Sequence, residues 1–537
     1  MPSAETAQLK PEARKNSFLA EARRHKTLAL LLLALGFALR FWNAAYRFFN
    51  ADEILHYFLS VQPSLLATYR ASLTTAHPPL LIVVLHYWGA LGHSELFLRL
   101  PSVLAGTGFC WLMYRWLKLV TDETTSLIGL VLFLFSPALI IVSAEVRQYG
   151  LLLLFSGLSL YFLEYAIQRN SARCMLLSAL SLYFALLSHY SSLIVALAIG
   201  MYALVRLASA RERAGLVSAW VAGQLGALAL VGFLFTHHVP MLRARGAPEA
   251  IADTYLRRSV FQPGQDHVML FVARSNIRLF HYLFSQAAVG VVALLLFVIA
   301  IVFLFRGKRS ANNDLRPLDW QLALLFALPL VVNCALATLR VYPYGGTRHN
   351  SYLSMFAFPA IAVALSRWKP QWTAQKLTVV ALILLVCNVF PTPLGEYIPI
   401  KDQGRTRMAK AMNSLNAVPA GSVIFTDHEG GLMLSYYLCH DKVVQLAQPL
   451  SRLLTEGCGR FSVVSVGEWI FKDDTFEPDL RDARHLYGWK SGTPLWFFQA
   501  GWFIDKEALL RDELRQAGCT APREFGKNIF LCRITVP

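Results

Sequence analysis

Charged residues are scarce in this sequence. Only 15% of its 537 residues are Asp, Glu, Lys or Arg, whereas 55% are hydrophobic and the mean hydropathy is +0.45. A soluble globular domain carries about 25% charged residues. The deficit excludes a chain that meets water along its whole length, and it predicts a multi-pass α-helical membrane protein.

Acidic residues are scarcer than basic ones, 33 against 50, which gives a net charge of +17. Residues 392–537 contain 17 basic and 17 acidic residues, so the whole excess lies in residues 1–391. There the basic residues stand between apolar runs, where the orientation of spanning helices accounts for them. The excess therefore does not indicate a nucleic-acid partner.

Three other features are missing from the sequence. No pair of cysteines has the spacing of a zinc site, and no Gly-rich nucleotide-binding motif follows a predicted strand. The chain also has no clear internal repeat. Many transporter folds are built from internal repeats, so this last absence favours an enzyme over a transporter.

Eleven apolar runs approach or exceed the length that a spanning helix needs, ~20 residues. They are 27–43, 99–118, 125–142, 150–168, 173–188, 191–207, 215–236, 287–305, 319–340, 351–367 and 374–391. A twelfth run, 80–92, is short and follows a His-Pro-Pro sequence. We expect it to be a juxtamembrane or re-entrant helix that does not cross.

Basic residues in short loops predict the orientation, because they favour the cytoplasmic side. Residues 1–26 are expected to be a cytoplasmic leader, since no small-residue cleavage site follows the first apolar run. If residues 1–26 are cytoplasmic, the basic clusters between the predicted spans also lie on the cytoplasmic side. The segments expected outside are 44–98, 143–149, 237–286, 341–350 and everything from about residue 392.

Residues 392–537 have the pattern of a small extracytoplasmic α/β domain. Strands are predicted at 422–426, 461–466, 495–499 and 529–534, and a helix at 431–438. Four of the eight cysteines fall here, where an oxidising environment favours disulfides. Of the three connectivities that four cysteines allow, we expect Cys439–Cys458 and Cys519–Cys532.

An acidic pair, Asp52-Glu53, directly follows the first apolar run. One carboxylate of such a pair can deprotonate or orient an acceptor hydroxyl as a general base. The other can hold the geometry. The same pair would also suit a plain polar boundary of the membrane.

Two histidines lie at outer corners of the predicted bundle. His77 precedes two prolines, which either direct it toward a polar site or only end a helix. His189-Tyr190 separates two apolar runs with almost no loop, as a ligand contact or as a structural corner. Imidazolium can bind a phosphate, and neutral imidazole can bind a metal.

Two short outer loops add cationic and aromatic residues. The loop at 143–149 carries Glu145, Arg147 and Tyr149. The loop at 341–350 carries Tyr344, Arg348 and His349. Arginine suits bidentate contact with phosphate. These residues predict an outward-facing polar site for an anionic lipid, which would serve an enzyme or a transporter.

The order of these motifs resembles a bacterial family of polyprenyl-phosphate-sugar glycosyltransferases with the GT-C fold. Protein O-mannosyltransferases and the lipid A aminoarabinose transferase are relatives of this family. The resemblance covers about residues 40–390. It rests on Ala51-Asp52-Glu53, His77-Pro78-Pro79-Leu80, Glu95-Leu96-Phe97-Leu98-Arg99-Leu100-Pro101-Ser102, Ser143 to Tyr149, Ser188-His189-Tyr190 and Thr347-Arg348-His349. In the last motif, His349 replaces the tyrosine of the family.

The resemblance implies a GT-C-like catalytic domain over residues 27–391 and an inverting transfer. The donor would be a sugar on a polyprenyl monophosphate, and the acceptor a lipid, a glycan or a protein. Asp52 would be the catalytic carboxylate, with Glu53 in support. The expected donor contacts are His77, Arg147, Tyr149, His189, Tyr190, Arg348 and His349, with Glu145 and Tyr344 as further candidates. The expected location is the bacterial inner membrane, with the site on the outer side.

Two other functions stay open at this point. The alternative is a lipid-linked sugar flippase or other transporter, and a third is a scaffold whose outer domain binds a partner. No cofactor is required by the sequence. A divalent metal is not excluded, because His77, Glu145 and His189 could assemble a site, although their spacing requires none.

Overall fold

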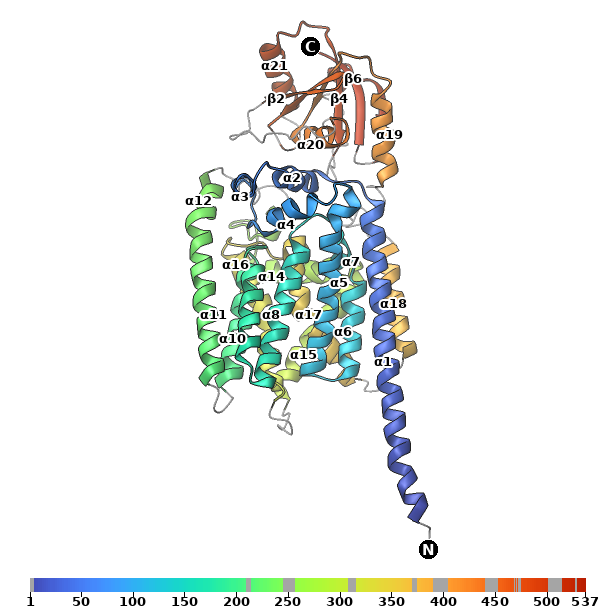
Figure 1. Ribbon diagram of the computed structural model, residues 1–537. Coiled ribbons are helices and arrows are strands. Elements are labelled where there is room, and N and C mark those ends of the chain that lie inside the picture. Colours follow the sequence, from blue (N-terminus) through green and yellow to red (C-terminus); the bar gives the residue numbers. More distant parts are fainter. Residues whose placement is uncertain are drawn as a thin grey trace. The chain divides into compact units, whose positions relative to one another are not determined.

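The fold was analysed in a computed structural model. The structure describes residues 4–208, 214–244, 256–307, 315–368, 374–389, 404–439, 453–467, 469, 471, 475–500, 514–526 and 529–537. The chain forms two compact units (Figure 1). The helical unit comprises 1–42, 76–80 and 100–394, and the α/β unit comprises 43–75, 81–99 and 395–537.

The helical unit contains most of the apolar runs as helices. Its long helices are α1 (Ala4–Tyr46), α5 (Glu95–Val120), α6 (Glu123–Phe135), α8 (Tyr149–Arg169), α9 (Ala172–Leu186), α10 (Ser192–Ala208), α11 (Ala214–Phe233), α14 (Val268–Phe284), α15 (Ala287–Arg306), α16 (Asp319–Thr338), α17 (Ser354–Trp368) and α18 (Ala374–Val389). Short helices are α7 (Pro137–Val142), η1 (Leu234–His238), α12 (Val239–Ala244), η2 (Arg257–Ser259) and η3 (Arg348–Leu353).

Six helices among the described residues are long and apolar enough to cross a membrane. They are His25–Tyr46, Glu95–Val120, Tyr149–Arg169, Ala214–Met241, Ala287–Arg306 and Asp319–Thr338. The other predicted spans are also helical, but they are shorter or interrupted. The protein is therefore an integral multi-pass membrane protein, and the full number of about eleven crossings stays a prediction.

One predicted span, 125–142, is broken into α6 and α7 at Ser136-Pro137. Proline has no N–H group, so the carbonyl of Phe133 loses its normal helical partner. The buried Arg40 of α1 donates to this carbonyl at 3.1 Å and to the carbonyl of Leu134 at 3.0 Å. The Arg40 guanidinium thus binds backbone carbonyls at the break, and it holds α1 against α6.

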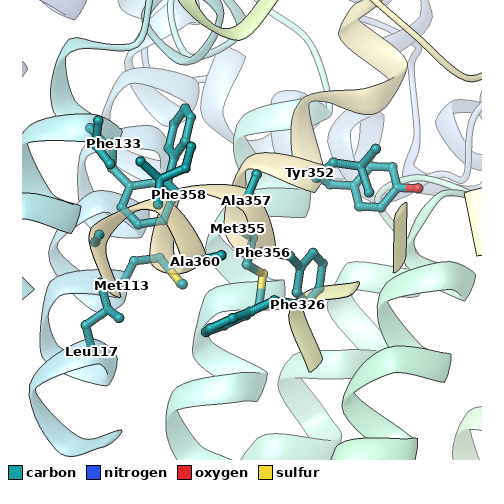
Figure 2. Close-up of a cluster of buried hydrophobic side chains, with 14 of the residues drawn as sticks. Met113, Leu117, Phe133, Phe326, Tyr352, Met355, Phe356, Ala357, Phe358 and Ala360 are labelled. Atoms are coloured by element: carbon teal, nitrogen blue, oxygen red, sulfur yellow. The ribbon is translucent and has the colours of Figure 1, made fainter. Parts of the chain in front are cut away.

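The helices pack around one apolar core. Figure 2 shows part of it, where α17 lies against α5, α6 and α16. The rings of Phe133 and Phe358 meet at 5.3 Å between centroids. The preceding turn, η3, is buried in the same part of the chain, so this core also anchors the end of the 341–350 loop, where Arg348 and His349 lie.

The α/β unit combines helices near the first span with the C-terminal part of the chain. Its helices are α2 (Ala51–Ser60), α3 (Leu65–Ser72), α4 (Leu80–Gly89), α19 (Arg405–Leu415), α20 (His428–Tyr437) and α21 (Phe476–Tyr487). Its strands are β1 (Val423–Thr426), β2 (Leu453–Cys458), β3 (Phe461–Val466), β4 (Pro494–Ala500), β5 (Thr520–Glu524) and β6 (Ile529–Thr535).

The strands form one mixed sheet in the order β2-β3-β1-β4-β6-β5. The central strand β1 is parallel to β3 and β4, and the remaining pairs are antiparallel. Strands β1, β3, β4 and β6 match the predicted ranges closely, and α20 covers the predicted helix. The elements β2, β5, α19 and α21 were not predicted.

Both disulfides that were expected from the sequence are present, Cys439–Cys458 and Cys519–Cys532. The first joins the end of α20 to the end of β2, and the second joins β6 to the residue before β5. The predicted domain boundary near residue 392 lies outside the described residues. The compact unit includes more than 392–537, because 43–75 and 81–99 pack with the C-terminal part.

Candidate active site

Three histidines from distant parts of the sequence lie together in the helical unit. The rings of His77 and His189 are stacked at 5.1 Å between centroids, and His349 lies 6.4 Å and 5.8 Å from them. The backbone N–H of Leu80 donates to the carbonyl of Leu187 at 3.0 Å. This bond ties the Pro-Pro segment to the corner between α9 and α10, so it brings His77 beside His189.

Tyr149 completes this group, which we call the histidine cluster (His77, Tyr149, His189 and His349). Its buried ring lies 5.2 Å from that of His189 and 5.9 Å from that of His349. Its hydroxyl is 3.5 Å from Nδ1 of His349. Arg147 lies over the Tyr149 ring at 5.9 Å, which adds a guanidinium to the cluster.

The protonation of His189 follows from its surroundings. Its Nδ1 accepts the backbone N–H of Ser191 at 3.1 Å and lies 2.8 Å from the Ser191 hydroxyl. The ring proton is therefore on Nε2. Burial, together with the charge of Arg147, lowers the pKa of His189 from 6.5 to about 3. His189 is thus a neutral imidazole that can donate one hydrogen bond, rather than an imidazolium.

The loop at 143–149 supplies both charges that were predicted there. Glu145 and Arg147 are almost fully buried. The carboxylate of Glu145 lies 4.0 Å from a guanidinium nitrogen of Arg348. The two short predicted loops therefore meet at this ion pair.

A network of amides holds the loop at 341–350 in shape. The buried Asn350 side chain donates to the carbonyl of Gly345 at 3.2 Å and to the hydroxyl of Thr347 at 3.1 Å, and it accepts from Asn333 of α16. Gly345 has a φ of +134°, a conformation that favours glycine. These bonds flank Arg348 and fix the backbone that carries it.

Two predicted aromatic residues point to other partners. Tyr190 pairs through its hydroxyl with Nδ1 of His238, and their rings stack at 5.8 Å. Tyr344 is buried and donates to the Asn276 side chain of α14 at 2.8 Å. Tyr344 thus anchors its loop against α14.

The acidic pair lies in the α/β unit, and its two members differ. Asp52 is partly exposed in the first turn of α2. Glu53 is fully buried. The backbone N–H of Glu53 donates to the Asn50 side chain, and the Glu53 carboxylate accepts from the Asn50 N–H. This capping box fixes the start of α2, one residue before Asp52.

Arg99 is a residue of this region whose role the sequence did not reveal. It donates from Nε and Nη2 to the two oxygens of Glu53, at 2.8 Å and 2.6 Å. Its other N–H groups go to the carbonyls of Ala44, Arg47 and Phe48. One signal was available, because Arg99 stands in the Glu95 to Ser102 motif on which the family resemblance rests.

No group of three or more His, Cys, Asp or Glu side chains within the described ranges has the arrangement of a metal site. Of the three residues considered for a metal, His77 and His189 come together. The histidine cluster offers hydrogen-bond donors and lies beside two arginines. This chemistry suits a phosphate.

Comparison with known proteins supports the resemblance drawn from the motifs. Residues 76–236 match the model of a family described as dolichyl-phosphate-mannose-protein mannosyltransferase. The match covers 161 of the 537 residues, so about 30% of the chain is similar to that glycosyltransferase family. The match includes His77, Arg147 and His189, whereas Asp52 and Arg348 lie outside it. No curated protein sequence matches the chain.

Several solved structures are similar at low identity. An oligosaccharyltransferase of Archaeoglobus fulgidus has a TM-score of 0.44 and 12% identity, over 76% of this chain and 62% of that one. ArnT of Cupriavidus metallidurans has a TM-score of 0.37 and 13% identity, over 94% of this chain and 97% of that one. The Pmt1–Pmt2 protein O-mannosyltransferase complex of S. cerevisiae has a TM-score of 0.30 and 15% identity, over 41% of this chain and 33% of that one. Such TM-scores are too low to establish a common fold. The chain spans less than two thirds of the length of the oligosaccharyltransferase and of the matched O-mannosyltransferase chain.

Proposed function

We propose that the protein transfers a sugar from a polyprenyl monophosphate carrier to an acceptor at the outer face of the membrane, with inversion at the anomeric carbon. The acceptor is a lipid, a glycan or a protein. The observation that carries this proposal is the histidine cluster with Arg147 and Arg348, inside a unit of apolar helices that matches a glycosyltransferase family.

The donor phosphate is assigned to the helical unit. A sugar phosphodiester carries one negative charge, and its ester bond to the sugar breaks as the transfer proceeds. Negative charge then grows on the departing phosphate. Arg147 and the Nε2–H of the neutral His189 are suited to stabilise that charge, because they are fixed before the reaction and largely shielded from water.

Glu145 has a supporting part in this arrangement. Its carboxylate faces Arg348 at 4.0 Å, and it would repel a phosphate if it stood alone. Paired with Arg348, it orients the guanidinium instead. We therefore assign Arg147 as the principal phosphate ligand and Arg348 as the second one.

We assign Asp52 as the carboxylate that activates the acceptor. The acceptor oxygen or nitrogen attacks the anomeric carbon, the bond from that carbon to the phosphate oxygen breaks, and the electron pair leaves with polyprenyl phosphate. Asp52 takes the acceptor proton, or orients the group that loses it. Glu53 is buried and its carboxylate already accepts four hydrogen bonds, from Arg99 and Asn50. Its assigned role is support.

The experiment uses the purified full chain in lipid with a panel of polyprenyl-phosphate sugars and candidate acceptors. Release of free polyprenyl phosphate identifies the donor, and a glycosylated product identifies the acceptor. If the labelled donor crosses to the opposite leaflet intact and no polyprenyl phosphate appears, the transporter alternative is correct instead.

A further inference from the structure

The α/β unit joins the C-terminal part of the chain to the segment that precedes Asp52. Helix α20 packs on α2. At the end of α20, the hydroxyl of Tyr437 accepts the backbone N–H of Phe49 at 2.7 Å. This contact connects residues 388 positions apart in the sequence. It lies three residues before Asp52.

The same hydroxyl continues into a charged network. Tyr437 donates to one oxygen of Glu95 at 2.5 Å, and Arg405 of α19 donates to the other oxygen at 2.7 Å. Burial, and then the Glu95 carboxylate, raise the pKa of Tyr437 well above its ordinary value. The phenol therefore stays protonated and uses its hydrogen for Glu95, while its oxygen accepts from Phe49.

Glu95 and Arg99 lie on adjacent turns at the start of α5, four residues apart, and both lead to the entry of α2. Arg99 binds the carbonyl of Phe48 at 2.8 Å, and its guanidinium lies over the Phe49 ring at 4.8 Å. Tyr437 takes the N–H of Phe49. The one peptide group that joins Phe48 to Phe49 is therefore held by two side chains. Arg99 of α5 binds its carbonyl, and Tyr437 of α20 binds its N–H.

This arrangement controls where α2 begins. Asn50 is the N-cap, so a shift of the Phe48–Phe49 backbone moves the cap and turns the first turn of the helix, where Asp52 lies. Misplacement of a reacting group by about 1 Å can cost on the order of 100-fold in rate. A hydroxyl from the C-terminal part of the chain thus bears on the position of the carboxylate.

We infer that Tyr437 is a positioning residue for Asp52, which makes the C-terminal part of the chain a component of the acceptor side of the active site. This inference rests on the proposed function, because it takes Asp52 as the acceptor carboxylate. It assigns no contact between Tyr437 and a substrate.

The chain offers a matched control at the neighbouring position. Tyr436 lies on the same helix, and its ring contacts Phe49 at 5.3 Å and Tyr57 at 5.6 Å. Its hydroxyl lies within the electrostatic reach of Glu95, but the hydrogen bonds to Phe49 and Glu95 are made by Tyr437. Tyr436→Phe and Tyr437→Phe therefore remove the same atom from adjacent, similarly placed rings, and only the second removes the bond to Phe49.

The experiment measures turnover, the KM values for donor and acceptor, and local hydrogen exchange of residues 47–60 for both variants in lipid. Tyr437→Phe is expected to lower kcat for transfer at least fivefold and to speed exchange in 47–60, with the donor KM unchanged. Tyr436→Phe is expected to match the wild type. Glu95→Gln should show a smaller loss of the same kind, because it keeps an oxygen that accepts from Tyr437. It also serves as the second variant should Tyr437→Phe fold poorly.

A combination with Asp52→Asn separates positioning from general destabilisation. If Tyr437 acts through Asp52, adding Tyr437→Phe to Asp52→Asn leaves the residual turnover unchanged. A further loss in the double variant, or equal turnover of Tyr437→Phe and wild type, overturns the inference. Absence of transfer by the wild type would instead overturn the proposed function, so the two failures are distinguishable.

Discussion

Arg99 donates to both carboxylate oxygens of the fully buried Glu53, at 2.8 Å and 2.6 Å. Its three remaining N–H groups go to backbone carbonyls at 44, 47 and 48, so all five donors of the guanidinium are used. The two residues of the acidic motif, Asp52 and Glu53, therefore have different roles. Glu53 holds the backbone around α2, and its neighbour Asp52 keeps an exposed edge.

The first prediction separates the two acidic residues. Glu53→Gln removes the negative charge that pairs with the buried Arg99 and replaces one of the two accepting oxygens by an NH2 donor. It should therefore lower the free energy of unfolding by about 3–5 kcal/mol. Asp52→Asn should cost about 1 kcal/mol or less, yet lower transfer by about 100-fold or more and leave only a residual rate. Thermal unfolding and turnover of both variants check this. Full turnover by Asp52→Asn would remove Asp52 from the mechanism.

The second prediction concerns Arg147. Arg147→Ala should lower transfer by about 100-fold or more, because it removes a preorganised cation from the departing phosphate. Arg169→Ala is the control, since that guanidinium lies over the Tyr165 ring at the far end of α8. Binding of polyprenyl phosphate should weaken only in the Arg147 variant. Equal binding by both variants would show that the phosphate lies elsewhere.

The third prediction follows from His189. Its pKa falls from 6.5 to about 3 in the folded chain, so between these values the unfolded state binds a proton that the folded state does not. Stability should therefore be constant above about pH 6.5 and decline as the pH falls toward 3. Melting temperatures between pH 7.5 and 4 should decline less steeply in His189→Gln. The exposed control, His485→Gln, should keep the wild-type slope.

A fourth prediction tests the loop that carries Arg348 and His349. A Cβ on Gly346 would stand 2.7 Å from the backbone oxygen of Arg278, so Gly346→Ala must displace the loop. Transfer should fall about tenfold or more. Gly232→Ala is the control, because nothing lies within 4 Å of its Cβ position. If the two variants are equally active, the placement of this loop does not limit the reaction.

The fifth prediction concerns the Cys439–Cys458 disulfide, which closes the chain two residues after Tyr437. Replacement of both cysteines by alanine should lower the free energy of unfolding of the α/β unit by about 2–4 kcal/mol. The rate of transfer should also fall, since α20 carries Tyr437. Denaturant titration with and without reductant checks the first effect. Insensitivity of the wild type to reductant would contradict it.

Much of the helical unit could be predicted, because apolar runs and polar corners leave clear marks in a sequence. His77, Tyr149, His189 and His349 were expected at one site, and they are neighbours in the structure. The short helices were harder. The break at Pro137 was hidden inside one continuous apolar run. Arg40, which binds the carbonyl of Phe133 at this break, lies 93 residues before Phe133.

The α/β unit was less predictable, since its stability depends on distant contacts. The bond between Tyr437 and Phe49 joins the two ends of the unit, and no local pattern marks it. Strand β5, Thr520–Glu524, is exposed at every residue, so it lacks the alternation by which strands are recognised. The partner of Arg99 was equally hidden, because Glu53 lies 46 residues earlier in the sequence.

The most direct measurement of the central claim is the joint quantification of polyprenyl phosphate and glycosylated acceptor formed by the full chain in lipid vesicles. The proposal predicts one molecule of product for each molecule of polyprenyl phosphate released by the wild type, and about 100-fold less of both, or lower still, with Asp52→Asn or Arg147→Ala. Donor that stays intact throughout, or full product formation by both variants, would contradict it.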